Sequence, residues 1–185
     1  MKRTLLAGLA AGVAMYIWSS IAHLALPLGS AGVSQIPNEQ PLVDQLNKTL
    51  GPNAGLYAFP AMDARGSMDD YSKKLASNPS GLLAYTPPGA SALTSRQLVV
   101  EFATELTEGY LLVFLLAATR LVTFGARLGF ATGAGMLAAL ATNLPYWNWY
   151  HFPATYTIAY MFTGVVAYLV AGAAAALILK PAKAQ

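Results

Sequence analysis

Three glutamates open an otherwise apolar stretch, EFATELTEGYLLVF, which runs from Glu101 to Phe114. Glu101, Glu105 and Glu108 are four and three residues apart. On a helix this spacing places them within an arc of roughly 60°. Carboxylates in such a row can bind a cation, exchange protons or pair with polar groups on a facing helix. Which of these they do depends on their depth and on the side chains opposite them.

The composition indicates a membrane protein. Hydrophobic residues make up 56% of the 185 residues and charged residues only 10%, with a mean hydropathy of +0.47. Soluble domains average about 25% charged residues. The chain has no cysteine, which excludes disulfides and thiolate metal sites. The net charge of +3 comes from scattered basic residues, so the chain has no basic stripe that would bind nucleic acid.

Four apolar runs are long enough to cross a membrane, which takes about 20 residues of helix. The runs are 4–28, 99–122, 128–146 and 154–179. The first run resembles a signal peptide, because Lys2 and Arg3 precede it and small residues follow it at 29–31. Its apolar part is too long for a typical signal, so we expect an uncleaved helix. The sequence therefore predicts a mainly α-helical integral membrane protein with a four-helix transmembrane bundle.

The lysines and arginines predict the orientation, because cytoplasmic loops carry an excess of these residues. Four spans place six of them on one side, namely Lys2, Arg3, Arg120, Arg127, Lys180 and Lys183. We expect that side to be the bacterial cytoplasm, with both termini on it and the protein in the inner membrane. The expected organisation is helix one at 1–28, an extracytoplasmic insertion at 29–95, helices two to four at 96–180, and a cytoplasmic tail at 181–185.

The insertion is predicted to form a small α+β unit. Residues 37–50 (PNEQPLVDQLNKTL) have helical leucine spacing with Asn38 as the expected N-cap, and residues 66–79 (GSMDDYSKKLASNP) have Ser67 in the same role. Segments 54–61 and 80–89 share the pattern Gly-Leu-x-Ala-aromatic, typical of short strands bounded by Gly and Pro. Because two strands alone are marginally stable, we expect the unit to pack on the membrane helices or on a partner.

Small residues recur at four-residue spacing in three predicted helices. The rows are Gly8 and Gly12; Gly125, Gly129 and Gly133; and Ala167, Ala171 and Ala175. Such rows let helices approach closely in lipid. Packing within this chain is the simpler expectation for each row, and a contact between subunits is the alternative.

Aromatic residues gather where the third span ends and the fourth begins, in PYWNWYHFPATYTIAY at 145–160. Amphipathic rings at this level anchor a protein among the lipid headgroups. We expect an aromatic belt formed by Trp18, Trp147, Trp149, Tyr150 and Tyr156. Stacking of the same rings on a quinone, a pigment or a lipid is the alternative.

Depth singles out Glu108 among the three acids. With a span of about 20 residues, Glu101 lies at the outer interface and Glu105 just below it. Glu108 lies about 10 Å deeper than Glu101. An acid at that depth needs a partner, and we expect a buried polar cluster that adds His23, Ser19, Ser20, Asn143 and His151. A hydrogen-bonded Glu108–His23 pair is the favoured arrangement.

A metal site is a less favoured use of this cluster. Glu105, Glu108 and His23 are suitable ligands for Fe, Mn or Zn, and helix bundles draw such ligands from facing helices. The chain has only two histidines, however, and lacks the paired Glu-x-x-His signature. It also lacks a Gly-x-Ser-x-Gly elbow, a phosphate loop, a dinucleotide fingerprint and a His-Glu-x-x-His motif. The sequence does not identify a cofactor, and a metal, quinone, pigment or lipid ligand stays open.

Four segments in the first half of the chain form a distinctive set: YIWSSIAHLALPLG at 16–29, IPNE at 36–39, GLYAFP at 55–60 and NPSGLLAY at 78–85. Together they resemble a family of small uncharacterised bacterial multi-pass membrane proteins. That family has no assigned activity, so the resemblance implies a membrane location and no catalytic residues.

The sequence favours a non-catalytic accessory or assembly subunit of a larger bacterial membrane complex, of respiratory or photosynthetic type. Its partners would be membrane lipid and other membrane subunits or copies of itself. The first alternative is a small transport or proton-conducting protein that uses the Glu101, Glu105 and Glu108 face with His23. The second alternative is a membrane-embedded metalloenzyme.

Overall fold

The computed structural model describes residues 1–179, and its internal contacts divide the chain into two units. Met1–Val33 and Leu93–Gln185 form one, called here the helical unit, and Ser34–Ala92 form the inserted unit. The expected cytoplasmic tail at 181–185, with Lys180 and Lys183, lies outside the described residues. Each unit is described by itself below.

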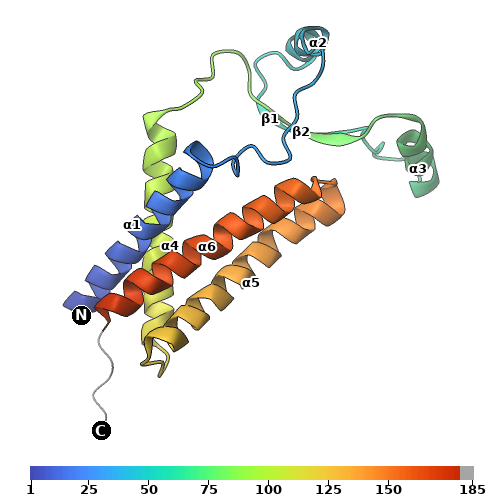
Figure 1. Ribbon diagram of the computed structural model, residues 1–185. Coiled ribbons are helices and arrows are strands. Elements are labelled where there is room, and N and C mark those ends of the chain that lie inside the picture. The colour runs from blue at the N-terminus through green and yellow to red at the C-terminus, as the bar shows by residue number, and fades with distance from the viewer. Residues whose placement is uncertain (180–185) are drawn as a thin grey trace. The chain divides into compact units, whose positions relative to one another are not determined.

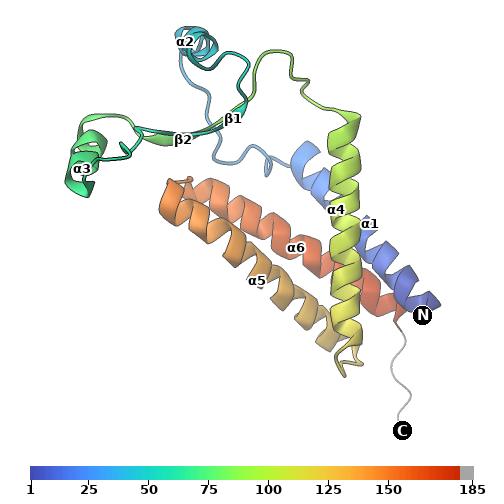
Figure 2. The same ribbon diagram turned by 180° about the vertical axis from the view of Figure 1, so that it is seen from behind.

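Four helices make up the helical unit: α1 (Lys2–Leu24), α4 (Ser95–Ala117), α5 (Phe124–Tyr150) and α6 (Ala154–Ile178). Helix α1 packs against both α4 and α6, and α6 also packs along α5 (Figures 1 and 2). Helix α4 touches α5 and α6 only lightly. The main contacts thus follow the order α4–α1–α6–α5. The starts of α1 and α5 and the ends of α4 and α6 lie at one end of the unit.

Three of these helices, α1, α5 and α6, are long and apolar enough to cross a membrane. Helix α4 is not among them, because three glutamates interrupt its apolar run. The prediction of a mainly helical chain is therefore confirmed, and three of its helices could cross a membrane. The fourth span, through α4, stays a prediction.

The helix ends differ from the predicted runs for local reasons. Helix α4 begins at Ser95 because Thr94 and Gln97 form a capping box, in which each side chain bonds the backbone N–H of the other. Helix α5 continues through Pro145 to Tyr150, beyond the predicted end of the third run at residue 146. The helix stops at His151, whose φ of 56° is left-handed, where the N–H groups of His151 and Phe152 donate to the Tyr146 carbonyl.

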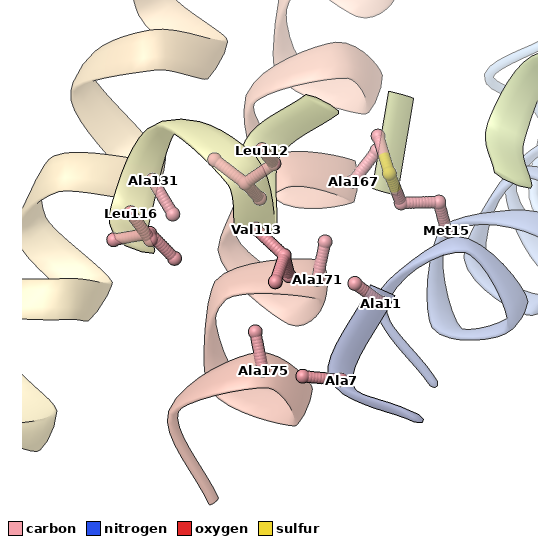
Figure 3. Close-up of a cluster of buried hydrophobic side chains, with 10 residues drawn as sticks. All are labelled: Ala7, Ala11, Met15, Leu112, Val113, Leu116, Ala131, Ala167, Ala171 and Ala175. Carbon is pink, nitrogen blue, oxygen red and sulfur yellow. The ribbon is translucent and has the colours of Figure 1, made fainter. Parts of the chain in front are cut away.

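The core of the helical unit is narrow and rich in alanine. Ten buried residues form it: Ala7, Ala11, Met15, Leu112, Val113, Leu116, Ala131, Ala167, Ala171 and Ala175 (Figure 3). The alanine row of α6 therefore packs within the chain, as predicted. Small side chains let α1 and α6 come close, which is how helices gain packing contacts in lipid.

The glycine row of α5 does not pack within the chain, so our prediction is wrong for this row. A Cβ atom built on Gly125, Gly129 or Gly133 meets no atom within 4 Å. The buried face of α5 lies elsewhere, at Arg127, Ala131, Gly135 and Ala139. Two nearly opposite faces of this helix are thus rich in small residues, and only the buried one contacts α6.

The inserted unit has the predicted order of helix, strand, helix and strand: α2 (Gln40–Leu50), β1 (Gly55–Phe59), α3 (Met68–Ser77) and β2 (Gly81–Tyr85). The strands pair antiparallel, with Gly55 opposite Tyr85. Ser67 caps α3 as predicted, by accepting a hydrogen bond from the Asp70 N–H. Asn38 does not cap α2. It has a φ of 50° and precedes the N-cap, Glu39, because the proline in the first turn already favours helical backbone there.

Candidate functional site

Helix α4 has one buried stripe, and Glu105 is its outermost member. The stripe contains Glu105, Gly109, Leu112, Val113 and Leu116, which share one face by three- and four-residue spacing. Glu105 is 7% exposed. Glu101, one turn earlier, is exposed, and Glu108 is half-buried at the edge of the stripe. The three acids therefore share one side of α4 but differ in burial, and only Glu105 belongs to the buried stripe.

A contact between two glycines sets the distance between α1 and α4. A Cβ atom on Gly109 would lie 2.7 Å from the Cα of Gly12. One on Gly12 would lie 2.8 Å from the Glu105 carbonyl oxygen. The two backbones therefore touch beside Glu105. Ser19 lies seven residues beyond Gly12, which is two turns along the same face of α1 and places its hydroxyl toward α4.

Ser19 supplies the partner of Glu105. Its Oγ donates to Glu105 Oε1 over 2.6 Å, a short hydrogen bond between two partly shielded side chains. Glu101, Glu108 and His23 are close enough to act on Glu105 electrostatically. The buried carboxylate thus joins α4 to α1 through one direct bond.

Glu108 interacts with α6 instead of α1. Its carboxyl group contacts the hydroxyl group of Tyr168. Tyr168 in turn packs on α5, because a Cβ atom on Gly135 would lie 2.6 Å from the Tyr168 Cβ. We expected His23, on α1, as the partner of Glu108. The structure instead pairs Glu108 with Tyr168, on α6.

His23 is exposed and supports the end of α1. Its Nδ1 donates to the Ser19 carbonyl oxygen over 2.9 Å, and its ring meets the Tyr160 ring edge-on at 5.9 Å. Because a carbonyl oxygen can only accept, the proton of this bond lies on Nδ1. Nε2 remains available to other groups. His23 therefore bonds the backbone of the last turn of α1, near enough to Glu105 to act on it electrostatically.

The other residues of the predicted polar cluster lie apart from Glu105. Ser20 is half-buried on α1. Asn143 donates to the Ala139 carbonyl of its own helix at 3.0 Å, and His151 is exposed at the end of α5. Nowhere in residues 1–179 do three His, Cys, Asp or Glu side chains come together in a way that could hold a metal ion.

The predicted belt residues fall into two groups. Trp147, Trp149 and Tyr150 are 49%, 75% and 50% exposed on the last turn of α5. Trp18 lies between helices, where its Nε1 donates to the Thr163 carbonyl of α6 over 2.9 Å. Tyr156 stacks on Tyr160 with ring centroids 4.2 Å apart. The first group is exposed, whereas Trp18 joins α1 to α6 and Tyr156 stacks within α6, so the aromatic belt stays a prediction.

Three residues of this region were not singled out from the sequence: Tyr160, Thr163 and Tyr168. Thr163 accepts the Trp18 hydrogen bond through its backbone carbonyl. Because every residue has such a carbonyl, the residue type could not predict this contact. Tyr160 and Tyr168 lie eight residues apart on α6, roughly 12 Å along the axis, and each meets a residue of the α1–α4 pair. A search for hydroxyl groups on one face of the fourth span would have found both tyrosines.

The polar contacts end where the apolar core begins. Glu105 and Glu108 precede Leu112, Val113 and Leu116 along α4, and these three pack with Ala7, Ala11 and Met15 of α1 (Figure 3). Among the residues that the structure describes, the buried charged side chains are Glu105 and, at the start of α5, Arg127, which donates to the Leu121 and Leu179 carbonyls.

No protein family, no curated protein and no solved structure matches this chain. The resemblance to small uncharacterised bacterial membrane proteins accordingly stays a prediction, and a function has to be argued from the residues and their contacts.

Proposed function

We propose that this chain is a four-span, non-catalytic subunit of a larger assembly in a bacterial inner membrane. The observation that carries the proposal is the glycine row of α5, Gly125, Gly129 and Gly133, which no other helix of the chain covers. The alanine row of α6 and the glycine row of α1 are both filled within the chain. Among the described residues, the glycine row of α5 is therefore the small-residue row on which no helix packs.

An uncovered glycine row is costly unless something packs on it. Each glycine in a helix is less favourable than alanine by about 1 kcal/mol. Gly12 and Gly109 recover that cost through close backbone contact, whereas the α5 row recovers nothing within this chain. A helix of another subunit, packed closely along the row, would supply the missing contacts.

The basic residues support four spans with both termini in the cytoplasm. Lys2, Arg3, Arg120 and Arg127 belong to the end of the helical unit where α1 begins and α4 ends (Figures 1 and 2). Helix α4 has 23 residues, which gives it a length of about 35 Å, enough to cross the hydrocarbon core. Its two buried or half-buried acids have partners, which lowers the cost of placing them in lipid.

Proton or ion movement is the second candidate, and buried Glu105 is the observation in its favour. A conducting path needs polar groups or water on both sides of the carboxylate. Among the described residues, Glu101, His23 and the Glu108–Tyr168 pair are near Glu105, and the apolar residues Leu112, Val113 and Leu116 follow along α4. The metalloenzyme alternative finds no ligand set among residues 1–179. The structure therefore favours a structural subunit over both alternatives.

Site-specific cross-linking tests the proposal. Because the chain has no cysteine, Gly129→Cys introduces a single thiol on the row. In native membranes we expect benzophenone-4-maleimide on this cysteine to yield one discrete product after illumination, because its photoreactive end inserts into C–H bonds and needs no thiol in the partner. A doubled mass would identify a second copy, and any other mass another subunit. The control is Phe114→Cys, on the face of α4 that is 69% exposed. No product at Gly129, or equal yields at both positions, would refute the proposal.

A further inference from the structure

The helices of the inserted unit leave their apolar faces uncovered. Neither α2 nor α3 contains a buried residue, and Tyr85 is the only buried apolar side chain described between 34 and 92. On α2, the apolar residues Leu42, Val43, Leu46 and Leu50 fall within an arc of about 100°. On α3, Met68 and Leu75 are 65% and 39% exposed on one face. Each helix is thus amphipathic, with its apolar side open.

An apolar groove continues the open face of α2. It has a volume of about 470 Å³ between α2 and β2, and Val43, Leu46, Leu83 and Tyr85 are among the residues that line it. Tyr85 holds the two elements together, because its hydroxyl group donates to the Gly51 carbonyl oxygen over 2.9 Å. The uncovered apolar surface is therefore continuous from the helix into the sheet.

Chain connectivity keeps this surface close to the membrane. The helical unit continues to Val33 and α2 begins at Gln40. The six intervening residues span at most about 20 Å when fully extended. The return segment, 86–92, is similarly short. If α1 and α4 both cross the membrane, as the proposed function requires, the inserted unit is held at the outer boundary by two short tethers.

The charge of the inserted unit favours an uncharged surface. It has five acids, Glu39, Asp44, Asp63, Asp69 and Asp70, and four bases, Lys48, Arg65, Lys73 and Lys74. Helices α2 and α3 each carry equal numbers of both signs. A strongly charged protein partner would find no complementary patch. The near-neutral headgroup region of a zwitterionic lipid surface does fit, and the tethers provide a high local concentration, so that little intrinsic affinity is needed.

We infer that the inserted unit lies on the outer lipid surface, with the open faces of α2 and α3 and the groove beside β2 set into the boundary between headgroups and acyl chains. This inference rests on the proposed membrane embedding. Amphipathic helices bury their apolar face about 5–10 Å into that boundary. The unit then acquires from lipid the apolar cover that its own two strands and two helices do not provide.

Fluorescence quenching in nanodiscs tests the inference on the full chain. Single cysteines are placed on opposite faces of each helix: Leu42→Cys against Asp44→Cys on α2, and Leu75→Cys against Lys73→Cys on α3. Each is labelled with a small fluorophore in phosphatidylcholine nanodiscs that contain lipids with a nitroxide near the headgroup. We expect quenching at Leu42 and Leu75 to be several-fold stronger than at Asp44 and Lys73. Phe114→Cys, with a nitroxide deep in the acyl chains, reports membrane embedding separately.

Each other outcome has a defined meaning. Equal, weak quenching at all four positions, with strong quenching at Phe114, would overturn the lipid contact and leave the membrane embedding intact. Weak quenching at Phe114 as well would remove the embedding itself. If labels at Leu42 and Leu75 were shielded both from lipid nitroxides and from aqueous iodide, protein and not lipid would cover these faces, which would also overturn the inference.

Discussion

Replacing Gly109 by alanine is expected to destabilise the purified protein, and replacing it by leucine to separate α1 from α4. The added Cβ would lie 2.7 Å from the Gly12 Cα and 2.9 Å from the Gly8 carbonyl oxygen. These are backbone atoms, so only a shift of a whole helix relieves the collision. Overpacking of this kind costs about 1–3 kcal/mol for a small insertion. Thermal unfolding in detergent should show Gly109→Ala several degrees below the parent protein.

Gly129→Ala is the matched control. It lies on an α5 face where an added Cβ meets nothing within 4 Å. The higher helix propensity of alanine is expected to raise the stability of the purified chain by up to about 1 kcal/mol. The same substitution should therefore have opposite signs at the two glycines. A loss of similar size at both positions would mean that Gly109 is not in a closer contact than Gly129.

Removing the hydroxyl group of Ser19 is expected to cost about 1–3 kcal/mol, because the Glu105 carboxylate would remain buried without its donor. Glu105→Leu alone should cost less, since a serine hydroxyl in a helix can turn to a carbonyl four residues back. The double variant Ser19→Ala with Glu105→Leu should recover much of the loss, because both polar groups are then absent. Unfolding free energies of the four proteins give the coupling energy.

The control for this double-mutant cycle is Ser20→Ala, at the residue that follows Ser19 in α1. Ser20 lies outside the Glu105 group, so its loss should change the stability little. The pairing of Ser19 and Glu105 would be contradicted by strict additivity, in which the double variant loses the sum of the two single losses.

The three glutamates show what the sequence could and could not predict. Their common face and the need of the deepest acid for a partner follow from spacing and from the cost of charge in lipid. Depth alone suggested Glu108 as the buried acid. The structure buries Glu105, because the stripe Glu105, Gly109, Leu112 and Leu116 faces α1. The sequence predicts that stripe from its four- and three-residue spacing. Considering both the helix face and the depth of each acid would have identified Glu105 as the buried one.

The partners of these acids could not be predicted in the same way. Pairing depends on how four helices cross, and the order α4–α1–α6–α5 has no signature in any one helix. Ser19 meets Glu105 because Gly12 and Gly109 touch. Tyr168 meets Glu108 because α6, which packs mainly on α1 and α5, also contacts α4 directly. The sequence offers both the Tyr168 hydroxyl group on α6 and the His23 imidazole on α1 as partners of Glu108. Only the packing of the helices decides between them.

Local structure in the inserted unit was easier to predict than its surroundings. The strands and the Ser67 cap follow from turn residues, β-propensity and capping chemistry that act within a few positions. Asn38 was assigned as a cap because its residue type is typical of one, yet Pro41 two residues after the real cap determines where α2 begins. What covers the open faces of α2 and α3 depends on molecules beyond this chain, which no local pattern encodes.

The central claim is that α4 crosses the membrane, which makes the chain a four-span protein with its inserted unit outside. The direct measurement is labelling of Arg96→Cys and Arg120→Cys, at the two ends of α4, with a membrane-impermeant maleimide in spheroplasts. Our account predicts that Arg96→Cys is labelled in intact spheroplasts and Arg120→Cys only after permeabilisation. Labelling of both positions from the same side would contradict it, because α4 would then enter and leave the membrane on one face or lie outside it.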